Sequence, residues 1–246
     1  MIVKHIDAPE ICCDEIWEDA YNRFETPEQE IFKFTKRLRR LGSDDIDRDA
    51  RVIELFCGRG NGLVALSRMG FGNVEGVDLS LSLLQQYRGN STLHLADCRQ
   101  LPFDNESVDL AIVQGGLHHL PSLPDDLKSC FAETARVLRP QGQFWIVEPW
   151  MTPFLKWAHR ITDHPIVRRC YARGDALATM TEREAKTYYR WLGCGDEILK
   201  TLNQQFVTRR QRIAWGKWEW VGMAKQRISA SNHADNLKAA PEKFAD

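Results

Sequence analysis

The chain of 246 residues lacks any apolar run long enough to cross a membrane. A spanning helix needs about 20 consecutive apolar residues. The first residues include His5 and Asp7, where a secretory signal would need a continuous apolar region. We therefore expect a cytoplasmic protein with no membrane span.

An excess of charge is also absent, because 33 Lys and Arg residues face 34 Asp and Glu residues. A dedicated nucleic-acid-binding protein usually carries a basic surface, so nucleic-acid partners are not favoured, although they stay open. The seven cysteines include no C-x-x-C pair and are odd in number. This pattern favours reduced thiols over a disulfide framework, and it offers no ligand set for a metal.

One stretch organises the rest of the chain: R-V-I-E-L-F-C-G-R-G-N-G, from Arg51 to Gly62. The apolar run 52–56 followed by three glycines predicts a buried strand, a tight turn and a helix. Glycine lets the backbone approach a ligand, and the helix offers free N–H groups. The G-x-G-x-G spacing differs from the G-x-G-x-x-G of dinucleotide sites. We expect a nucleotide-type site here, with a ligand-free turn as the alternative.

Apolar runs alternate with helical segments over the following hundred or so residues. Strands are expected at 52–56, 74–78, 92–96, 108–113 and 143–147, and helices at 62–69, 80–87 and 125–138. This alternation predicts an α/β fold with a parallel sheet covered on both faces. Asp78 and Asp97 each end a strand, so we expect both to meet the glycine loop at one edge of the sheet.

Four motifs carry a family resemblance: V-I-E-L-F-C-G-R-G-N-G, V-E-G-V-D-L-S, L-A-D-C-R-Q-L-P-F and R-V-L-R-P-Q-G-Q-F. In order and spacing they resemble class I S-adenosylmethionine-dependent methyltransferases of the small-molecule, UbiE-like branch, over roughly Thr26 to Gln226. The resemblance implies a Rossmann-like, doubly wound sheet of seven strands, mostly parallel, with strand seven antiparallel. Segments 198–207 and 217–224 would supply the last two strands.

The same resemblance implies S-adenosyl-L-methionine as the cofactor. By it, Gly58 and Gly60 approach the methionine part, and Asp78 binds the ribose hydroxyls. Asp97 would accept from the adenine amino group, with the Cys98 backbone serving the ring. The full set of expected cofactor residues is Glu54, Gly58, Gly60, Asp78, Leu79, Asp97, Cys98 and Gln114.

Candidate catalytic residues follow the fourth and fifth strands. His118 and His119 come directly after the strand at 108–113, and Glu148 ends the strand at 143–147. A histidine there could take a proton from a hydroxyl or amine at neutral pH. Adjacent residues point apart on regular secondary structure, so at most one histidine is expected to face the site. The alternative is that all three residues only support neighbouring loops.

Aromatic and basic residues are mixed in the segment after Pro149, where the resemblance implies a lid over the methyl acceptor at about 149–180. We expect Trp150, His159 and Arg168 to bind the acceptor, by stacking or by pairing with an anionic group. A helical cap with a solvated basic face is the alternative. Thr181 to Glu184 has the pattern of a capping box that opens a helix to Leu192.

The expected organisation has three parts. The resemblance implies that residues 1–50 form a helical cap over the cofactor, with Tyr21 or Phe24 closing over the ligand; the alternative is that these aromatic residues only pack against the first helix. Thr26 is expected to cap a helix at 27–40. Residues 51–225 form the methyltransferase core, and 226–246 form a polar tail expected to be disordered.

We expect methyl transfer to a small-molecule acceptor at oxygen or nitrogen, such as a sugar, a phenol or a secondary metabolite. RNA or protein methylation is the alternative. A NAD-dependent oxidoreductase or a non-catalytic cofactor-binding module is less favoured. The acceptor and the oligomeric state are not predicted.

Overall fold

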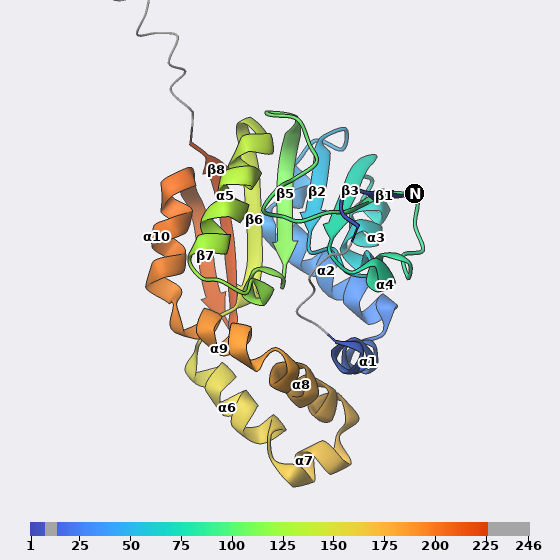
Figure 1. The fold of residues 1–246 in the computed structure, drawn as a ribbon, viewed down its shortest axis with the longest axis vertical. Helices are drawn as coiled ribbons and strands as arrows, with labels where there is room; N and C mark the ends of the chain where they lie inside the picture. The colour runs from blue at the N-terminus through green and yellow to red at the C-terminus, as the bar shows by residue number, and fades with distance from the viewer. Residues whose placement is uncertain (8–13, 226–246) are drawn as a thin grey trace, which may run out of the picture.

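A computed structural model describes residues 1–7 and 14–225, and its centre is one mixed β-sheet (Figure 1). The sheet has eight strands in the order β1-β4-β3-β2-β5-β6-β8-β7. Strands β1 to β6 run parallel, whereas β8 is antiparallel to both β6 and β7. The strands are β1 Ile2–Lys4, β2 Arg51–Leu55, β3 Asn73–Asp78, β4 Thr92–Leu95, β5 Val108–Gln114, β6 Leu138–Pro149, β7 Phe206–Ala214 and β8 Lys217–Ala224.

This architecture confirms the predicted Rossmann-like fold with an antiparallel C-terminal hairpin, and it differs from the prediction in two places. An eighth strand, β1, pairs with β4 at the sheet edge. The expected strand at 198–207 is wrong, because α10 occupies Gly195–Gln205 and β7 starts at Phe206. Ile198 and Leu202 are both fully buried and four residues apart, which places them on one face of a helix.

Helices cover both faces of the sheet, as the alternation of segments predicts. One apolar core lies between the sheet and a layer that includes α5 (Asp125–Val137), α9 (Ala185–Gly193) and α10. A second core lies under α2 (Pro27–Leu41) and α3 (Asn61–Arg68). The expected helix at 80–87 is shorter, since α4 spans only Leu81–Leu84.

The N-terminal segment adds α1 (Glu15–Phe24) and α2. The capping box predicted for α2 is present: Thr26 Oγ1 accepts from the Gln29 backbone N–H, and the Gln29 side chain accepts from the Thr26 N–H. A 3₁₀ turn, η1, follows at Ser43–Asp45. The predicted tail at 226–246 lies outside the described residues.

Three more helices, α6 (Pro153–Thr162), α7 (Pro165–Cys170) and α8 (Ala172–Arg183), extend with α9 beyond the C-terminal ends of the strands, and α1 packs along α8 (Figure 1). The capping box predicted at 181–184 is wrong. Thr181 belongs to the last turn of α8, and Glu184 joins α8 to α9.

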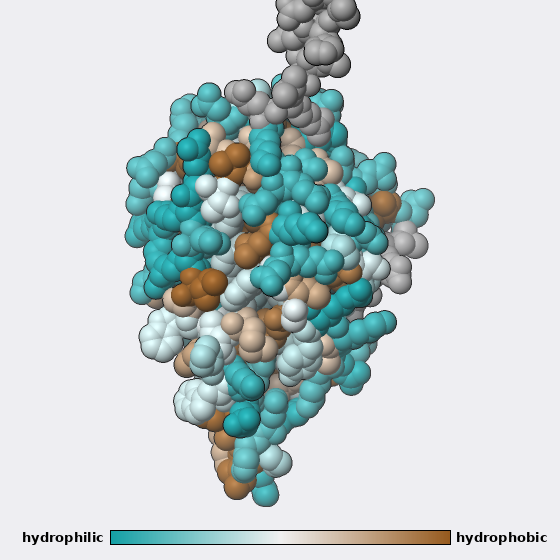
Figure 2. All heavy atoms as spheres, turned by 90° about the vertical axis from the view of Figure 1, so that its left-hand side faces the viewer, coloured by the Kyte–Doolittle hydropathy of each residue, from teal (hydrophilic) through white to brown (hydrophobic). Residues whose placement is uncertain are grey.

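The free end of this lobe exposes several large apolar side chains. Figure 2 shows apolar side chains gathered at the free end of the lobe. Trp157 and Ile166 are 59% and 66% exposed. No helix in residues 1–7 and 14–225 is long and apolar enough to span a membrane.

Candidate active site

The C-terminal ends of β2 to β5 open into a cavity of about 350 Å³ that α1, α2, α8 and α9 border. The cavity brings together most of the predicted cofactor residues: Glu54, Gly58, Asp78, Leu79, Asp97, Cys98 and Gln114. Gly60 is not in its wall. A Cβ there would lie 2.3 Å from the Tyr87 ring, and φ is +77°, so this glycine serves the turn itself.

The glycine loop and Asp78 form one hydrogen-bonded unit. Gly58 has φ of +52°, and a Cβ on it would meet only Leu83 and Tyr21 atoms at 3.9 and 4.0 Å, so the backbone faces open space. The Gly58 N–H donates to Asp78 Oδ2 at 2.7 Å, and the Ser80 N–H donates to Oδ1 at 2.8 Å. Burial raises the pKa of Asp78, although these hydrogen bonds act to lower it. Each oxygen keeps a lone pair for a ligand hydroxyl.

Glu54 and Gln114 lie side by side at the floor of the cavity. Gln114 Nε2 donates to Glu54 Oε1 at 3.1 Å, while Glu54 Oε2 and Gln114 Oε1 have no partner among the described residues. Burial raises the pKa of Glu54 to about 8. A Cβ on Gly62 would lie 2.1 Å from Glu54 Oε1, so only glycine fits behind the carboxyl group. These two buried, unpartnered oxygens fit a ligand that carries an ammonium group, whose positive charge would favour the ionised form of Glu54.

Asp97 already accepts hydrogen bonds from its neighbour Arg99. Arg99 Nε lies 3.0 Å from each Asp97 oxygen, Nη2 donates to Oδ2 at 2.7 Å, and the Arg99 N–H donates to Oδ1 at 2.8 Å. Burial alone would raise the pKa of Asp97, but the hydrogen bonds from Arg99 outweigh it and hold the pKa below its ordinary value. Asp97 is therefore an ionised acceptor that any ligand amino group would share with Arg99.

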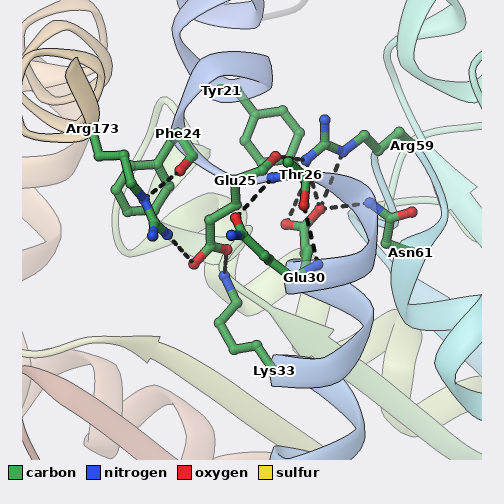
Figure 3. A network of polar contacts seen from close by, with 10 residues as sticks. Tyr21, Phe24, Glu25, Thr26, Glu30, Lys33, Arg59, Asn61 and Arg173 are labelled. Atoms are coloured by element: carbon green, nitrogen blue, oxygen red, sulfur yellow. Dashed lines mark hydrogen bonds and ion pairs between the residues drawn. The ribbon is translucent and has the colours of Figure 1, made fainter.

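A buried carboxylate joins the N-terminal helices to the glycine loop (Figure 3). Glu30 Oε1 accepts from the Tyr21 hydroxyl at 2.8 Å. Glu30 Oε2 accepts from Arg59 at 3.0 and 3.1 Å and from Asn61 at 2.7 Å. Tyr21 and Phe24 both border the cavity. The contacts fix α1 and α2 to the loop that forms the cavity wall.

His118 is held by a buried carboxylate. Glu148 Oε1 accepts from the backbone N–H groups of Gly116 and Leu117 at 2.7 and 2.8 Å, and Oε2 lies 2.7 Å from His118 Nδ1. Burial alone would raise the pKa of Glu148, but the His118 ring and these hydrogen bonds hold it below its ordinary value. An ionised carboxylate only accepts, so Nδ1 carries a proton, while Nε2 lies 3.8 Å from Glu184 Oε2. Glu148 itself is fully buried behind His118 and does not line the cavity.

Both histidines border the cavity, whereas at most one was expected to face it. They lie on the 3₁₀ turn η2 (Leu117–His119), where about three residues make a turn and neighbours diverge less than on a strand. Glu184 Oε2 lies 3.4 Å from His119 Nδ1 and accepts from Trp17 Nε1 at 3.0 Å. Ligand atoms of His118, His119 and Glu184 lie within 4.8 Å of one another, a geometry that a metal could use.

The predicted acceptor residues lie elsewhere, and none lines the cavity. Trp150 packs on Trp218, with ring centroids 4.9 Å apart. His159 is buried and lies 3.0 Å from the Tyr188 hydroxyl. Arg168 forms ion pairs with two carboxylates on the next helix, Asp175 and Glu182. These side chains hold the lobe together, whereas α8 and α9 face the cavity.

Several cavity residues carried no recognisable signal in the sequence. They come from the N-terminal helices, from α8 and α9, and from the start of β8: Trp17, Lys33, Arg37, Leu177, Met180, Glu184, Tyr188 and Lys217. None of these residues stands out from the sequence pattern of its own segment, and only the packing of α1 and α8 over the sheet brings them together.

Comparison with known proteins agrees with this geometry. Residues 53–146 match the family described as "Methyltransferase domain". A demethylmenaquinone methyltransferase of Lactiplantibacillus plantarum is 29% identical over 168 residues, covering 55% of this chain and 69% of the relative. A phthiotriol/phenolphthiotriol dimycocerosates methyltransferase of Mycobacterium leprae is 37% identical over 98 residues, covering 37% of this chain and 35% of the relative.

Among solved structures, a protein of Pyrococcus horikoshii OT3 superposes with a TM-score of 0.64 at 17% identity, over 87% of this chain and all of that one. The chain spans about half the length of the first curated relatives that it matches. Over residues 53–146 the chain matches a methyltransferase domain, and its fold is that of the class I S-adenosylmethionine-dependent methyltransferases, a family that implies S-adenosyl-L-methionine as the cofactor.

Proposed function

We propose that the protein transfers a methyl group from S-adenosyl-L-methionine to an oxygen or nitrogen atom of a small-molecule acceptor. The observation that carries this proposal is the single cavity in which the Glu54–Gln114 pair, the Gly58–Asp78 unit and Asp97 meet the histidines of η2. The cofactor supplies an activated methyl group when bound, so the protein mainly has to align the acceptor and exclude water.

In the cofactor half of the cavity, the proposed contacts follow the order of the strands across the sheet. Glu54 and Gln114 would hold the ammonium group, because their unpartnered oxygens need donors. Gly58 would face the methionine part, Asp78 would accept from the ribose hydroxyls, and Asp97 would accept from the adenine amino group. Leu79 and Cys98 border the same space.

On the acceptor side, His118 is the base that the geometry favours. Glu148 holds the ring through Nδ1, so Nε2, which lies 3.8 Å from Glu184 Oε2, is the nitrogen that would take a proton from an acceptor hydroxyl or from an ammonium group before attack. His119 borders the same space, but its Nδ1 lies nearer to Glu184 Oε2, at 3.4 Å, and its ring packs edge-on against Trp17, with ring centroids 5.5 Å apart.

The helical lobe supports a small acceptor over RNA or protein. α8 and α9 contribute Leu177, Met180 and Tyr188 to the wall, and α1 packs along α8, so the space for the acceptor is bordered on several sides. The formal charge of −1 gives no general attraction for nucleic acid. The two curated relatives above act, by their names, on small molecules or lipids. We propose that α1, α2, α8 and α9 form the lid.

Isotope transfer tests the proposal. Purified protein and S-adenosylmethionine with a deuterated methyl group are incubated with fractions of a cell extract, and the label is followed by mass spectrometry. Label in the metabolite fraction, lost with Asp78→Ala, is the expected result. Label in the RNA or protein fraction, with none in metabolites, would refute the small-molecule assignment.

A further inference from the structure

Three cationic side chains line one end of the cavity: Lys33 and Arg37 of α2, and Lys217 at the start of β8. Arg40, three residues beyond Arg37, contacts Glu219 of β8 at 2.5 Å, which fixes α2 over this strand. Side chains alternate along a strand, so Lys217 lies on the same face as Glu219 and therefore beneath α2.

The carboxylates around this cluster are already engaged. Lys33 is paired with Glu25, which also contacts Arg173. The other nearby carboxylates also have partners. Glu30 binds Tyr21, Arg59 and Asn61, and Glu148 binds His118 and two backbone N–H groups. Glu184 binds Trp17 and His119, and Glu219 binds Arg40 and Arg212. In residues 1–7 and 14–225, neither the Arg37 side chain nor the Lys217 side chain has a hydrogen bond or an ion pair.

The position of the cluster separates it from the expected cofactor contacts. Those contacts end at Gln114 of β5, and the next strands in the sheet are β6 and then β8. Lys217 pairs with Pro149 of β6, which directly follows the Glu148 that holds His118. The unpaired cations therefore lie on the side from which an acceptor would reach His118.

Charge repulsion within the cluster is visible at Lys217. Burial, followed by the charges of Arg37 and Lys33, lowers the pKa of Lys217 to about 8. The Arg37 guanidinium lies 5.7 Å from the Phe34 ring centroid, and the charges of Glu25 and Glu219 act on it without a hydrogen bond or ion pair to either. An anion between the two side chains would relieve the repulsion and satisfy both donors.

We propose that Arg37 and Lys217 bind an anionic group, a carboxylate or a phosphate, that the methyl acceptor carries. This inference rests on the proposed function and adds the acceptor class: an anionic small molecule whose remaining surface meets the apolar wall formed by Phe24, Leu177, Met180 and Tyr188.

Calorimetry on the complex with S-adenosylhomocysteine tests the inference, with benzoate and inorganic phosphate as probes. At least one probe should bind saturably to the wild-type complex, and Arg37→Gln and Lys217→Met should each weaken it at least about tenfold, the effect of losing a charge-assisted contact. Arg39→Gln and Lys36→Met, exposed on the same helix, are the matched controls and should bind like wild type. Benzamide, the neutral analogue of benzoate, should not bind.

Three other outcomes would contradict the inference or the proposed function. Absence of saturable binding of both probes to the wild-type complex would overturn the inference. A comparable loss of S-adenosylhomocysteine affinity in Arg37→Gln and Lys217→Met would also overturn it, because the cluster would then serve the cofactor carboxylate. Failure of the wild-type protein to bind S-adenosylhomocysteine would instead refute the proposed function.

Thermal unfolding gives a second readout that needs no ligand. Without an anion, Lys217→Met removes an unpaired cation from a cationic cluster, so its Tm should equal or exceed that of wild type. Phosphate should raise the wild-type Tm more than that of Lys217→Met. A lower Tm in Lys217→Met, together with an unchanged response to phosphate, would assign this lysine a purely structural role.

Discussion

Replacing Glu54 by glutamine should stabilise the protein and weaken cofactor binding at the same time. The carboxyl group is buried, one oxygen has no partner, and its pKa is raised to about 8. A glutamine keeps the shape, and its side-chain oxygen can accept from Gln114 Nε2. The variant loses the negative charge that a cofactor ammonium group would need.

The size of the effect follows from proton linkage. Between pH 4.5 and about 8, Glu54 is protonated in the folded protein and ionised in the unfolded chain, so folding must take up a proton. At pH 7 this costs about 3 kcal/mol, at about 1.4 kcal/mol for each pH unit above 4.5. The gain in folding stability of Glu54→Gln over wild type should therefore be absent below pH 4.5, grow up to about pH 8 and then stay constant.

Chemical denaturation of both proteins across this pH range measures the effect, and titration with S-adenosylhomocysteine measures the functional loss. Glu75→Gln, on the neighbouring strand, is a matched control for which we expect the opposite change in folding stability. The pKa of Glu75 is lowered, mainly by the hydrogen bond from His94, so its loss should destabilise the protein at neutral pH. If Glu54→Gln were no more stable than wild type at pH 7, the argument from burial would be refuted.

Three further predictions concern the base, the packing of the sheet and the metal question. His118→Gln should lower kcat by about 10² to 10⁴ for an oxygen acceptor, with S-adenosylhomocysteine affinity unchanged; an unchanged rate would show that no base acts at Nε2. Gly76→Ala should destabilise the fold by about 1 to 3 kcal/mol, because its Cβ would lie 2.7 Å from Cys57 Sγ. Gly72→Ala, with nothing within 4 Å and no positive φ, should leave the unfolding midpoint unchanged, and equal effects of the two changes would contradict the packing argument. A chelator should not reduce activity, because Glu184 Oε2 already accepts from Trp17 and faces His119; inactivation reversed by added metal would show that a metal occupies the cluster.

The order of strands and helices could be read from the sequence because burial on both sides of a parallel sheet leaves continuous apolar runs. The run ending at Asp78 and the glycines after Phe56 are local patterns of this kind. The segment 198–207 was misread because Ile198, Leu202 and Phe206 suit either a strand or a helix by residue type. Its helical form depends on packing between α5 and the sheet edge.

The acceptor side could not be predicted in the same way, because it is assembled from distant segments. Arg168 looked like a ligand by residue type, but its charge is used by Asp175 and Glu182 inside the lobe. Glu184 fitted a capping box by spacing, yet α8 continues through Thr181 and turns the carboxylate toward His119. Sequence spacing gives the local geometry of a helix start and carries no information about a partner that lies far along the chain.

The central claim is that the tips of β2, β3 and β4 hold an adenosyl sulfonium cofactor. Calorimetric titration of the wild-type protein and Asp78→Ala with S-adenosylhomocysteine, and separately with NAD, tests it most directly. We predict one-to-one binding of S-adenosylhomocysteine to wild type, a loss of about 2 to 4 kcal/mol in Asp78→Ala, and no binding of NAD. Tight NAD binding without any response to S-adenosylhomocysteine, or equal affinity of the two proteins for S-adenosylhomocysteine, would contradict the account.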